Sequence, residues 1–216
     1  MIGLNRYIDH TLLHPTASQK AIESLCREAI EHNFKAVCVN SSYTSQAAGL
    51  VKGENVSCAV TTGFPLGAMA SKAKAAEAYL AMCQGADEID MVLNLSWLKA
   101  GYFDKVAREI KMVKEVIGVS LLKVIIETAY LDEGEIVRAA KVVEDAGADF
   151  VKTSTGFAPR GAFIKDIELI KEAVHDRLGI KASGGIKTGK QALRLIEAGA
   201  TRIGTSNGIV LMQTLP

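Results

Sequence analysis

The stretch Gly147–Thr153, with the sequence GADFVKT, decides the fold because its pattern occurs three times in the chain. Gly85–Val92 reads GADEIDMV, and Gly199–Thr205 reads GATRIGT. In each case an alanine-rich segment with helical periodicity ends at a glycine, which can adopt the positive φ angle that ends a helix. A short run of β-branched residues then follows, as in a strand. Three such joints predict a chain of alternating β and α units.

Outward from these joints, eight short apolar runs can be assigned as strands. They are Tyr7–Thr11, Ala36–Asn40, Ser57–Thr61, Glu88–Val92, Leu121–Glu127, Phe150–Thr153, Ile180–Ala182 and Arg202–Thr205. The helices predicted between them include Ser18–His32, Ser71–Gln84, Asp132–Asp145 and Lys190–Glu197. The strand runs lack clean alternation, which is typical of a parallel sheet buried on both faces.

Eight units of about 27 residues each predict an α/β chain that forms one single-domain (β/α)8 TIM barrel over residues 1–216. The alternative is a doubly wound open sheet, although no Gly-x-Gly-x-x-Gly motif follows an early strand. In a barrel, catalytic groups lie at the carboxyl ends of the strands and on the loops that follow them.

The composition favours a soluble, cytoplasmic protein. The chain has 25 basic and 24 acidic residues, so no basic surplus indicates a nucleic-acid partner. No apolar window is long enough to cross a membrane, and the N-terminus has no signal-peptide pattern. The four cysteines form no Cys-x-x-Cys pair and are expected to be reduced thiols.

Ionisable residues interrupt four of the predicted strands where a barrel would ordinarily place valine or isoleucine. They are Asp90, Lys123, Glu127, Lys152 and Lys181. Any one of them could point outward or form a structural ion pair. Because burial of an ion costs several kcal/mol unless it is paired, several on neighbouring strands indicate a functional site.

Lys152 and Lys181 are expected on adjacent strands, about 5 Å apart. Two ammonium groups at that distance would repel each other by roughly 3 kcal/mol. That repulsion would lower the pKa of Lys152 and make it a nucleophile towards a carbonyl carbon. Asp90 could pair with one lysine or relay protons. The pattern therefore predicts a lysine that forms a Schiff base.

Two glycine-containing loops suggest a phosphate site. Ser183–Ile186 follows the seventh strand, with Thr188 as the cap of the next helix, and Gly204–Gly208 follows the eighth strand. Glycines let backbone N–H groups approach an anion, and these two loops form the usual phosphate site of barrels.

Over nearly its whole length the sequence resembles the deoxyribose-phosphate aldolase family, a group of class I aldolases. The matching motifs are Ile8–Leu13, Ala36–Asn40, Thr62–Gly67, Glu88–Val92, Leu122–Thr128, Phe150–Phe157, Lys181–Ile186 and Ile203–Ser206. The resemblance implies cleavage of 2-deoxy-D-ribose 5-phosphate to D-glyceraldehyde 3-phosphate and acetaldehyde. It also implies a homodimer or homotetramer, with no metal and no organic cofactor.

The resemblance further implies that Lys152 forms the Schiff base and that Asp90 and Lys181 donate and accept protons. The candidate substrate-binding residues are Thr155, Gly156, Gly184, Gly185, Gly204, Ser206 and Asn207. Two positions depart from the family pattern. Asn207 replaces a common serine, and Lys187 replaces a common arginine, which keeps the charge but loses the planar fork.

Other functions remain open from the sequence alone. A transaldolase-like enzyme would also use a lysine imine, whereas an isomerase or synthase barrel would use lysine only as an acid. A non-catalytic phosphate-binding protein would have little reason to place two lysines and an aspartate on strand ends. His10 and His14 have helical metal-ligand spacing, but Thr11 and Pro15 argue against a regular helix there.

Overall fold

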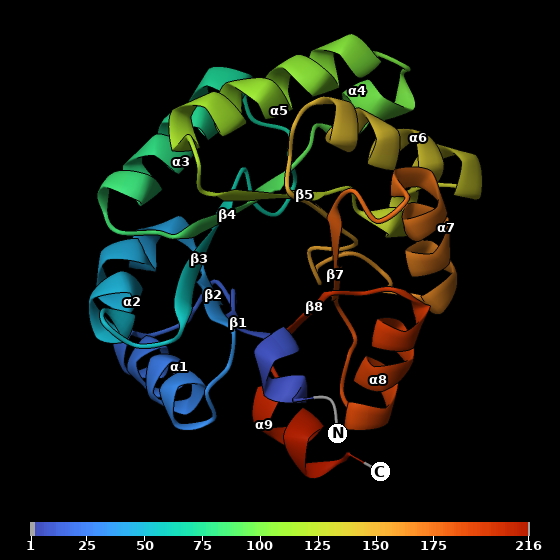
Figure 1. Ribbon diagram of the computed structural model, residues 1–216. Coiled ribbons are helices and arrows are strands. Elements are labelled where there is room, and N and C mark those ends of the chain that lie inside the picture. Colours follow the sequence, from blue (N-terminus) through green and yellow to red (C-terminus); the bar gives the residue numbers. More distant parts are fainter. Residues whose placement is uncertain (1–2, 216) are drawn as a thin grey trace.

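The computed structural model describes residues 3–215 and shows a closed barrel of parallel strands surrounded by helices (Figure 1). The strands are β1 (Ile8–Leu12), β2 (Ala36–Val39), β3 (Ser57–Thr62), β4 (Glu88–Val92), β5 (Leu121–Ile125), β6 (Phe150–Lys152), β7 (Gly179–Ser183) and β8 (Arg202–Thr205). Each strand pairs with its neighbours in chain order, and β8 closes on β1. The predicted (β/α)8 TIM barrel is confirmed, and the open-sheet alternative is wrong.

Helices follow the strands around the outside of the barrel. They are α1 (Gln19–Glu31), α2 (Thr44–Val51), α3 (Ser71–Cys83), α4 (Leu95–Lys99), α5 (Phe103–Ile117), α6 (Glu133–Asp145), α7 (Ile164–Val174), α8 (Gly189–Ala198) and α9 (Gly208–Gln213). Short 3-10 turns occur at η1 (Leu4–Tyr7), η2 (Ser41–Tyr43) and η3 (Thr128–Tyr130). Within residues 3–215, no helix is both long enough and apolar enough to span a membrane.

The predicted strand ends are accurate to within one residue except at β5, which was expected to continue to Glu127. The strand ends at Ile125 because Glu127 has a φ of 50°, in the left-handed region that no strand residue occupies. The four predicted helices are all present with similar ends. Thr188 caps α8 as expected, through a capping box with Gln191.

The repeated sequence pattern corresponds to a repeated structural joint. Its glycines Gly85, Gly147 and Gly199 all have positive φ angles, as predicted. The third residue of each repeat then accepts a hydrogen bond from a backbone N–H of the preceding strand. Asp87 Oδ2 accepts from Cys58, Asp149 Oδ2 from Leu122 and Thr201 Oγ1 from Ile180, at 2.7–3.0 Å. Each joint therefore fixes the start of one strand against the next.

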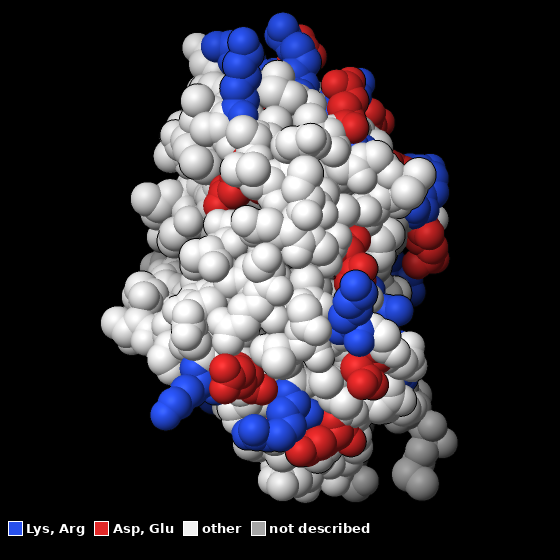
Figure 2. All heavy atoms as spheres, turned by 90° about the vertical axis from the view of Figure 1, so that its left-hand side faces the viewer, with Lys and Arg blue, Asp and Glu red and all other residues white. Residues whose placement is uncertain are grey.

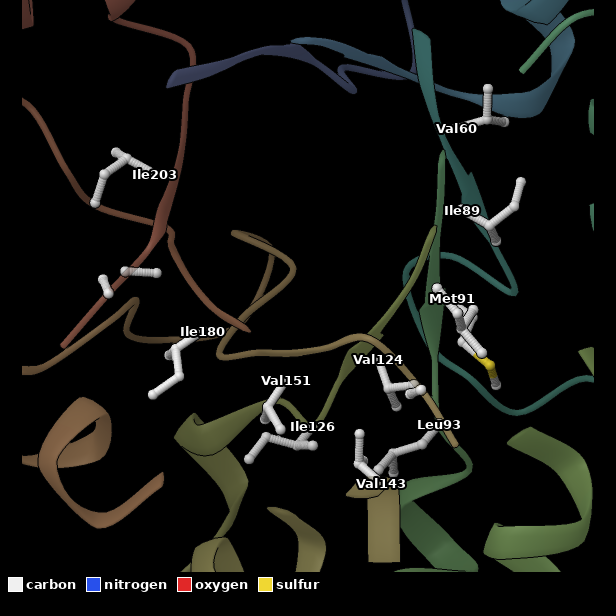
Figure 3. Packing of buried hydrophobic residues seen from close by; sticks show 14 of the residues in the cluster. Val60, Ile89, Met91, Leu93, Val124, Ile126, Val143, Val151, Ile180 and Ile203 are labelled. Atoms are coloured by element: carbon white, nitrogen blue, oxygen red, sulfur yellow. The ribbon is translucent and has the colours of Figure 1, made fainter. Parts of the chain in front are cut away.

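The apolar core lies between the sheet and the helices (Figure 3). Its side chains include Ile89, Met91, Val124, Val151, Ile180 and Ile203, all buried. Because successive strand residues point to opposite faces, these outward positions leave their neighbours pointing into the barrel. A second buried cluster consists only of Ala36, Cys38 and Ala59. These small residues leave room inside the barrel for the long side chains of the other strands.

Candidate active site

The barrel interior contains a continuous network of ion pairs. It consists of Asp9, Glu88, Asp90, Lys123, Lys152, Lys181 and Arg202, each less than 5% exposed. Strand register explains the grouping, because Asp90 pairs with Lys123, Lys152 with Lys181, and Lys181 with Arg202 across adjacent strands. Asp90, Lys152 and Lys181 are therefore brought together as predicted.

Asp90 accepts hydrogen bonds from three lysines. Its Oδ2 lies 2.7 Å from both Lys152 Nζ and Lys181 Nζ, and its Oδ1 lies 2.7 Å from Lys123 Nζ. Burial alone would raise the Asp90 pKa, but the three positive charges outweigh burial and hold the pKa well below its usual value. Asp90 is thus a carboxylate throughout the neutral range.

Lys181 lies between two carboxylates. Its Nζ is 2.5 Å from Asp9 Oδ2 and 2.7 Å from Asp90 Oδ2. Burial by itself would lower the Lys181 pKa, but the charges of Asp9 and Asp90 outweigh it and raise the pKa above its usual value. Gly204 provides space for this lysine, since a Cβ there would come within 3.0 Å of Lys181 Cε.

The expected proximity of the two lysines is confirmed. Because both Nζ atoms lie 2.7 Å from one oxygen, they are at most 5.4 Å apart, twice that distance. The simple picture of two facing ammonium groups was nevertheless incomplete. Asp90 lies between the amines and offsets much of their repulsion. The electrostatic environment of Lys152 therefore depends on the charges of the whole network and not on Lys181 alone.

Three members of the network, Asp9, Glu88 and Arg202, were not identified as functional groups from the sequence. Arg202 Nη1 lies 2.7 Å from Asp9 Oδ1 and 3.2 Å from Glu88 Oε2, and Lys123 Nζ lies 2.6 Å from Glu88 Oε2. The sequence feature that could have indicated these three residues is their position on the inward-facing side of β1, β4 and β8. Asp9 is held ionised, because the charges of Lys181 and Arg202 outweigh burial and lower its pKa to about 2.

A cavity of about 310 Å³ opens at the carboxyl ends of β1, β6, β7 and β8. All seven candidate substrate-binding residues line it: Thr155, Gly156, Gly184, Gly185, Gly204, Ser206 and Asn207. Lys187 and His14 also line the cavity. Lys152 is the one member of the ion-pair network that reaches it, since Asp90 and Lys181 are fully buried beneath.

Backbone donors are available on the glycine-containing loops. Gly184 and Gly185 have φ angles of 86° and 73°, which other residues rarely adopt. Within residues 3–215, the N–H groups of Gly184, Gly185 and Ser206 have no hydrogen-bond acceptor. The Asn207 N–H, in contrast, donates to Thr205 Oγ1 at 3.0 Å. The loops therefore present free donors beside the cavity.

Cys38 lies inside the barrel, and its Sγ is 3.8 Å from Asp90 Oδ2. Burial raises the pKa of this thiol, so it stays protonated beside the carboxylate. His10 and His14 have separate partners: His10 Nε2 is 2.8 Å from Glu28 and His14 Nδ1 is 2.8 Å from Thr16. Across the described part of the chain, no group of three or more His, Cys, Asp or Glu side chains is placed to hold a metal ion.

Comparison with known proteins agrees with this geometry. A profile of the DeoC/LacD family of aldolases matches residues 4–212. The chain is 49% identical to the deoxyribose-phosphate aldolase of Brevibacillus brevis, over 98% of this chain and 96% of the relative. It is 50% identical to that of Mycoplasmopsis pulmonis, over 97% of this chain and 96% of the relative.

Solved structures give the same result. The aldolase QR15 superimposes with a TM-score of 0.95 at 42% identity, covering 99% of this chain and 96% of that one. The tetrameric deoxyribose phosphate aldolase of Aeropyrum pernix has a TM-score of 0.88 at 32% identity, covering 97% and 89%. Both the family profile and these identities extend over nearly the whole chain. This chain belongs to the DeoC/LacD family of aldolases.

Proposed function

We propose that this protein is a class I aldolase, a lyase that reversibly cleaves 2-deoxy-D-ribose 5-phosphate to D-glyceraldehyde 3-phosphate and acetaldehyde. The observation that carries the proposal is the position of Lys152. Its amine lies at the floor of the cavity, 2.7 Å from Asp90, with free backbone donors on the facing glycine loops. A carbonyl group and a phosphate can thus be held at opposite ends of one small molecule.

The other members of the network balance one another in charge. The network contains three carboxylates, Asp9, Glu88 and Asp90. Three cations other than Lys152 are ion-paired with them, namely Lys123, Lys181 and Arg202. These three cations and three carboxylates compensate one another, so the buried carboxylates have partners apart from Lys152. Each carboxylate thus keeps an ion-pair partner when the Lys152 nitrogen becomes bonded to a substrate carbon.

In the first step the Lys152 amine attacks the C1 aldehyde of the open-chain sugar. The resulting carbinolamine takes up a proton from solvent, loses its hydroxyl group as water and becomes a protonated imine. Asp90 stays anionic 2.7 Å from the attacking nitrogen and stabilises the positive charge that forms there. The imine then serves as the electron sink for carbon–carbon cleavage.

In the second step a base removes the C3 hydroxyl proton. The electrons of the O–H bond form the new aldehyde, and those of the C2–C3 bond move into the imine, leaving an enamine on Lys152. D-Glyceraldehyde 3-phosphate departs. A proton is added at C2, and water hydrolyses the imine to release acetaldehyde and the free amine.

Lys181 and Asp90 are suited to different parts of this proton transfer. Lys181 holds its proton because two carboxylates flank it, so it can serve as the acid that protonates the enamine through Asp90 or water. Asp90 then passes the proton between the buried lysine and the cavity. The proton released earlier in the same turnover by the C3 hydroxyl replaces it through water and Asp90, so each cycle ends with Lys181 protonated and Asp90 ionised.

The phosphate is assigned to the free N–H groups of Gly184, Gly185 and Ser206, with Lys187 as a nearby cation. Binding of the 5-phosphate on these loops holds C1 near the Lys152 amine and lowers the entropic part of the activation barrier. Thr155, Gly156, Gly204 and Asn207 also line the cavity.

We further propose that the protein acts in the cytoplasm as a homodimer or homotetramer. The side of the barrel covered by α2 and α3 supports self-association. Figure 2 shows a broad central area on this side without lysine, arginine, aspartate or glutamate. Leu50 on α2 and Tyr79 and Leu80 on α3 are 42–58% exposed. An uncharged apolar face can meet a copy of itself without like charges facing each other.

The decisive experiment is reductive trapping. Protein incubated with 2-deoxy-D-ribose 5-phosphate and sodium borohydride should gain a covalent adduct that peptide mass spectrometry places on Lys152. Lys152→Met should show no adduct and no cleavage, whereas the exposed-lysine control Lys165→Met should behave like the wild type. Full cleavage activity without an adduct on Lys152 would overturn the assignment.

A further inference from the structure

Glu127 is a buried acid that the mechanism above does not use. It follows β5, is 3% exposed and has a φ of 50°. A left-handed conformation is uncommon for a residue other than glycine and persists only where surrounding contacts enforce it. Here the next residue is anchored, since Thr128 N donates to Thr153 O at 2.9 Å and Thr128 Oγ1 to Asp166 at 2.8 Å. The backbone turn points the Glu127 carboxylate at the loop after β6.

The Glu127 carboxylate is bound by one residue, Thr155. The Thr155 N–H donates to both carboxylate oxygens at 3.2–3.3 Å, and the Thr155 hydroxyl donates to Oε2. Within residues 3–215, Glu127 forms no ion pair with a lysine or arginine. Glu127 does not line the cavity, whereas Thr155 does. The acid can therefore influence a bound ligand only through Thr155 and through its charge.

These contacts determine what the Thr155 hydroxyl can offer. A hydroxyl group has one proton and two lone pairs. The proton is donated to Glu127, and one lone pair accepts the Phe157 N–H at 3.1 Å. The remaining lone pair is available to the cavity. Thr155 thus presents an acceptor alone, and its partner in the ligand must be a donor such as a hydroxyl.

We infer that Glu127 is a positioning residue that fixes Thr155 as a hydrogen-bond acceptor for a sugar hydroxyl, and so selects the hydroxylated aldol substrate. The inference rests on the proposed aldolase function. Acetaldehyde has no hydroxyl, so formation of its enamine uses Lys152 and the proton-transfer groups Asp90 and Lys181 but not the Thr155 acceptor. The sugar phosphate, which carries hydroxyls between C1 and the phosphate, needs the Thr155 acceptor as well. Glu127 should therefore affect carbon–carbon cleavage far more than enamine formation.

Two reactions of the same protein separate these roles. The first is cleavage of 2-deoxy-D-ribose 5-phosphate, measured as kcat/KM. The second is exchange of the acetaldehyde methyl protons for deuterium in D2O, followed by NMR, which reports imine and enamine formation alone. In Glu127→Gln the amide can donate to Thr155 and displace the hydroxyl proton towards the cavity. Cleavage should then fall by about 10- to 100-fold, the effect of losing one well-placed hydrogen bond.

Deuterium exchange in Glu127→Gln should fall by less than about 2-fold, since exchange does not use the Thr155 acceptor. The matched control is Glu109→Gln, because Glu109 is an equally buried acid bound to Lys74 outside the barrel interior. It should leave the ratio of cleavage to exchange as in the wild type. Thr155→Val should lower the ratio of cleavage to exchange as far as Glu127→Gln does. Thr155→Ser keeps the hydroxyl and should cleave the sugar at close to the wild-type rate. The double variant Glu127→Gln/Thr155→Val should cleave no more slowly than Thr155→Val alone.

A parallel loss of cleavage and exchange in folded Glu127→Gln would overturn the inference, because Glu127 would then act on Lys152 or on the fold. Independent, multiplicative effects of Glu127→Gln and Thr155→Val would also overturn it. If Glu127→Gln does not fold, the Thr155→Val and Thr155→Ser pair still tests the required acceptor. Failure of the aldolase function itself would look different, since the wild type would show neither exchange nor a borohydride adduct.

Discussion

Lys152 and Lys181 share one acceptor atom, since the Nζ of each lies 2.7 Å from Asp90 Oδ2. The two lysines occupy paired positions on β6 and β7, yet only Lys152 reaches the cavity. Lys181 is enclosed between Asp90 and Asp9. Under the proposed function, Lys152 attacks the substrate and Lys181 holds a proton close to the reacting nitrogen.

Replacement of Lys181 by methionine should separate imine formation from turnover. Removal of a general acid–base group typically lowers kcat by about 100-fold or more. The variant should still be trapped on Lys152 by borohydride, because the attacking amine remains. Loss of one partner of a buried ion pair should also lower the free energy of unfolding by about 3–5 kcal/mol, measured by urea denaturation.

Lys74→Met is the matched control for this loss of stability. Lys74 is as fully buried as Lys181 and is paired with Glu109 at 2.9 Å, but it lies on α3 outside the barrel. It should lose similar stability while kcat stays close to that of the wild type. Equal losses of kcat in the two variants would show that Lys181 acts only through the fold.

The carboxylates of the network predict the acid side of the stability profile. The Asp9 pKa is lowered to about 2, so folded Asp9 stays ionised at pH values where an unfolded aspartate, with a pKa near 3.9, is protonated. Its contribution is complete above about pH 5 and is lost as the pH falls towards 2, with a magnitude of about 2 kcal/mol. Urea unfolding between pH 2 and pH 8 should show this fall.

Asp9→Asn should be less stable than the wild type at neutral pH, and the difference should shrink as the pH is lowered through this range. Asp176→Asn, a change at an exposed aspartate that already has a positive φ, should follow the wild-type curve. An Asp9→Asn curve parallel to the wild type down to pH 2 would contradict the assignment of this acid sensitivity to Asp9.

The fold was predictable from sequence because its information is local and repeated. Gly85, Gly147 and Gly199 mark helix-to-strand joints, and the following β-branched runs mark the strands. Lys152 and Asp90 were predictable for a related reason: a charge in a strand buried on both faces is rare enough to indicate function.

The ion-pair network was not predictable in the same way. Arg202 and Glu88 lie at strand starts, where charges usually face solvent, and only the closed barrel brings them within 3.2 Å of each other. Glu127 was expected to continue a strand, because a left-handed φ at a glutamate leaves no trace in residue type. Long-range register and enforced backbone turns are properties of the closed structure.

Lys187 tests the phosphate assignment. Lys187 lines the cavity beside Gly185 and adds a positive charge to the free N–H groups of the loop. Lys187→Gln should raise the KM for 2-deoxy-D-ribose 5-phosphate by about 10-fold, the value of one charge-assisted hydrogen bond. The kinetics with unphosphorylated 2-deoxyribose should not change, since that sugar offers no anion.

Lys190→Gln is the matched control, because Lys190 is an exposed lysine at the start of α8 that does not line the cavity. It should leave the KM for both sugars unchanged. A similar rise in KM for both sugars in Lys187→Gln would place the phosphate elsewhere in the cavity.

The uncharged face over α2 and α3 predicts the position of the contact between subunits. Leu80 is 58% exposed on α3, next to Tyr79 at 56%. Leu80→Glu would put a charge on each copy of a self-associating face, and burying it unpaired would cost several kcal/mol. Light scattering coupled to size-exclusion chromatography should therefore show a smaller particle than the wild type.

Val210→Glu adds the same charge to an exposed apolar position on α9, away from this face (Figure 1), and should leave the particle mass unchanged. A Leu80→Glu particle of wild-type mass would place the subunit contact on another side of the barrel.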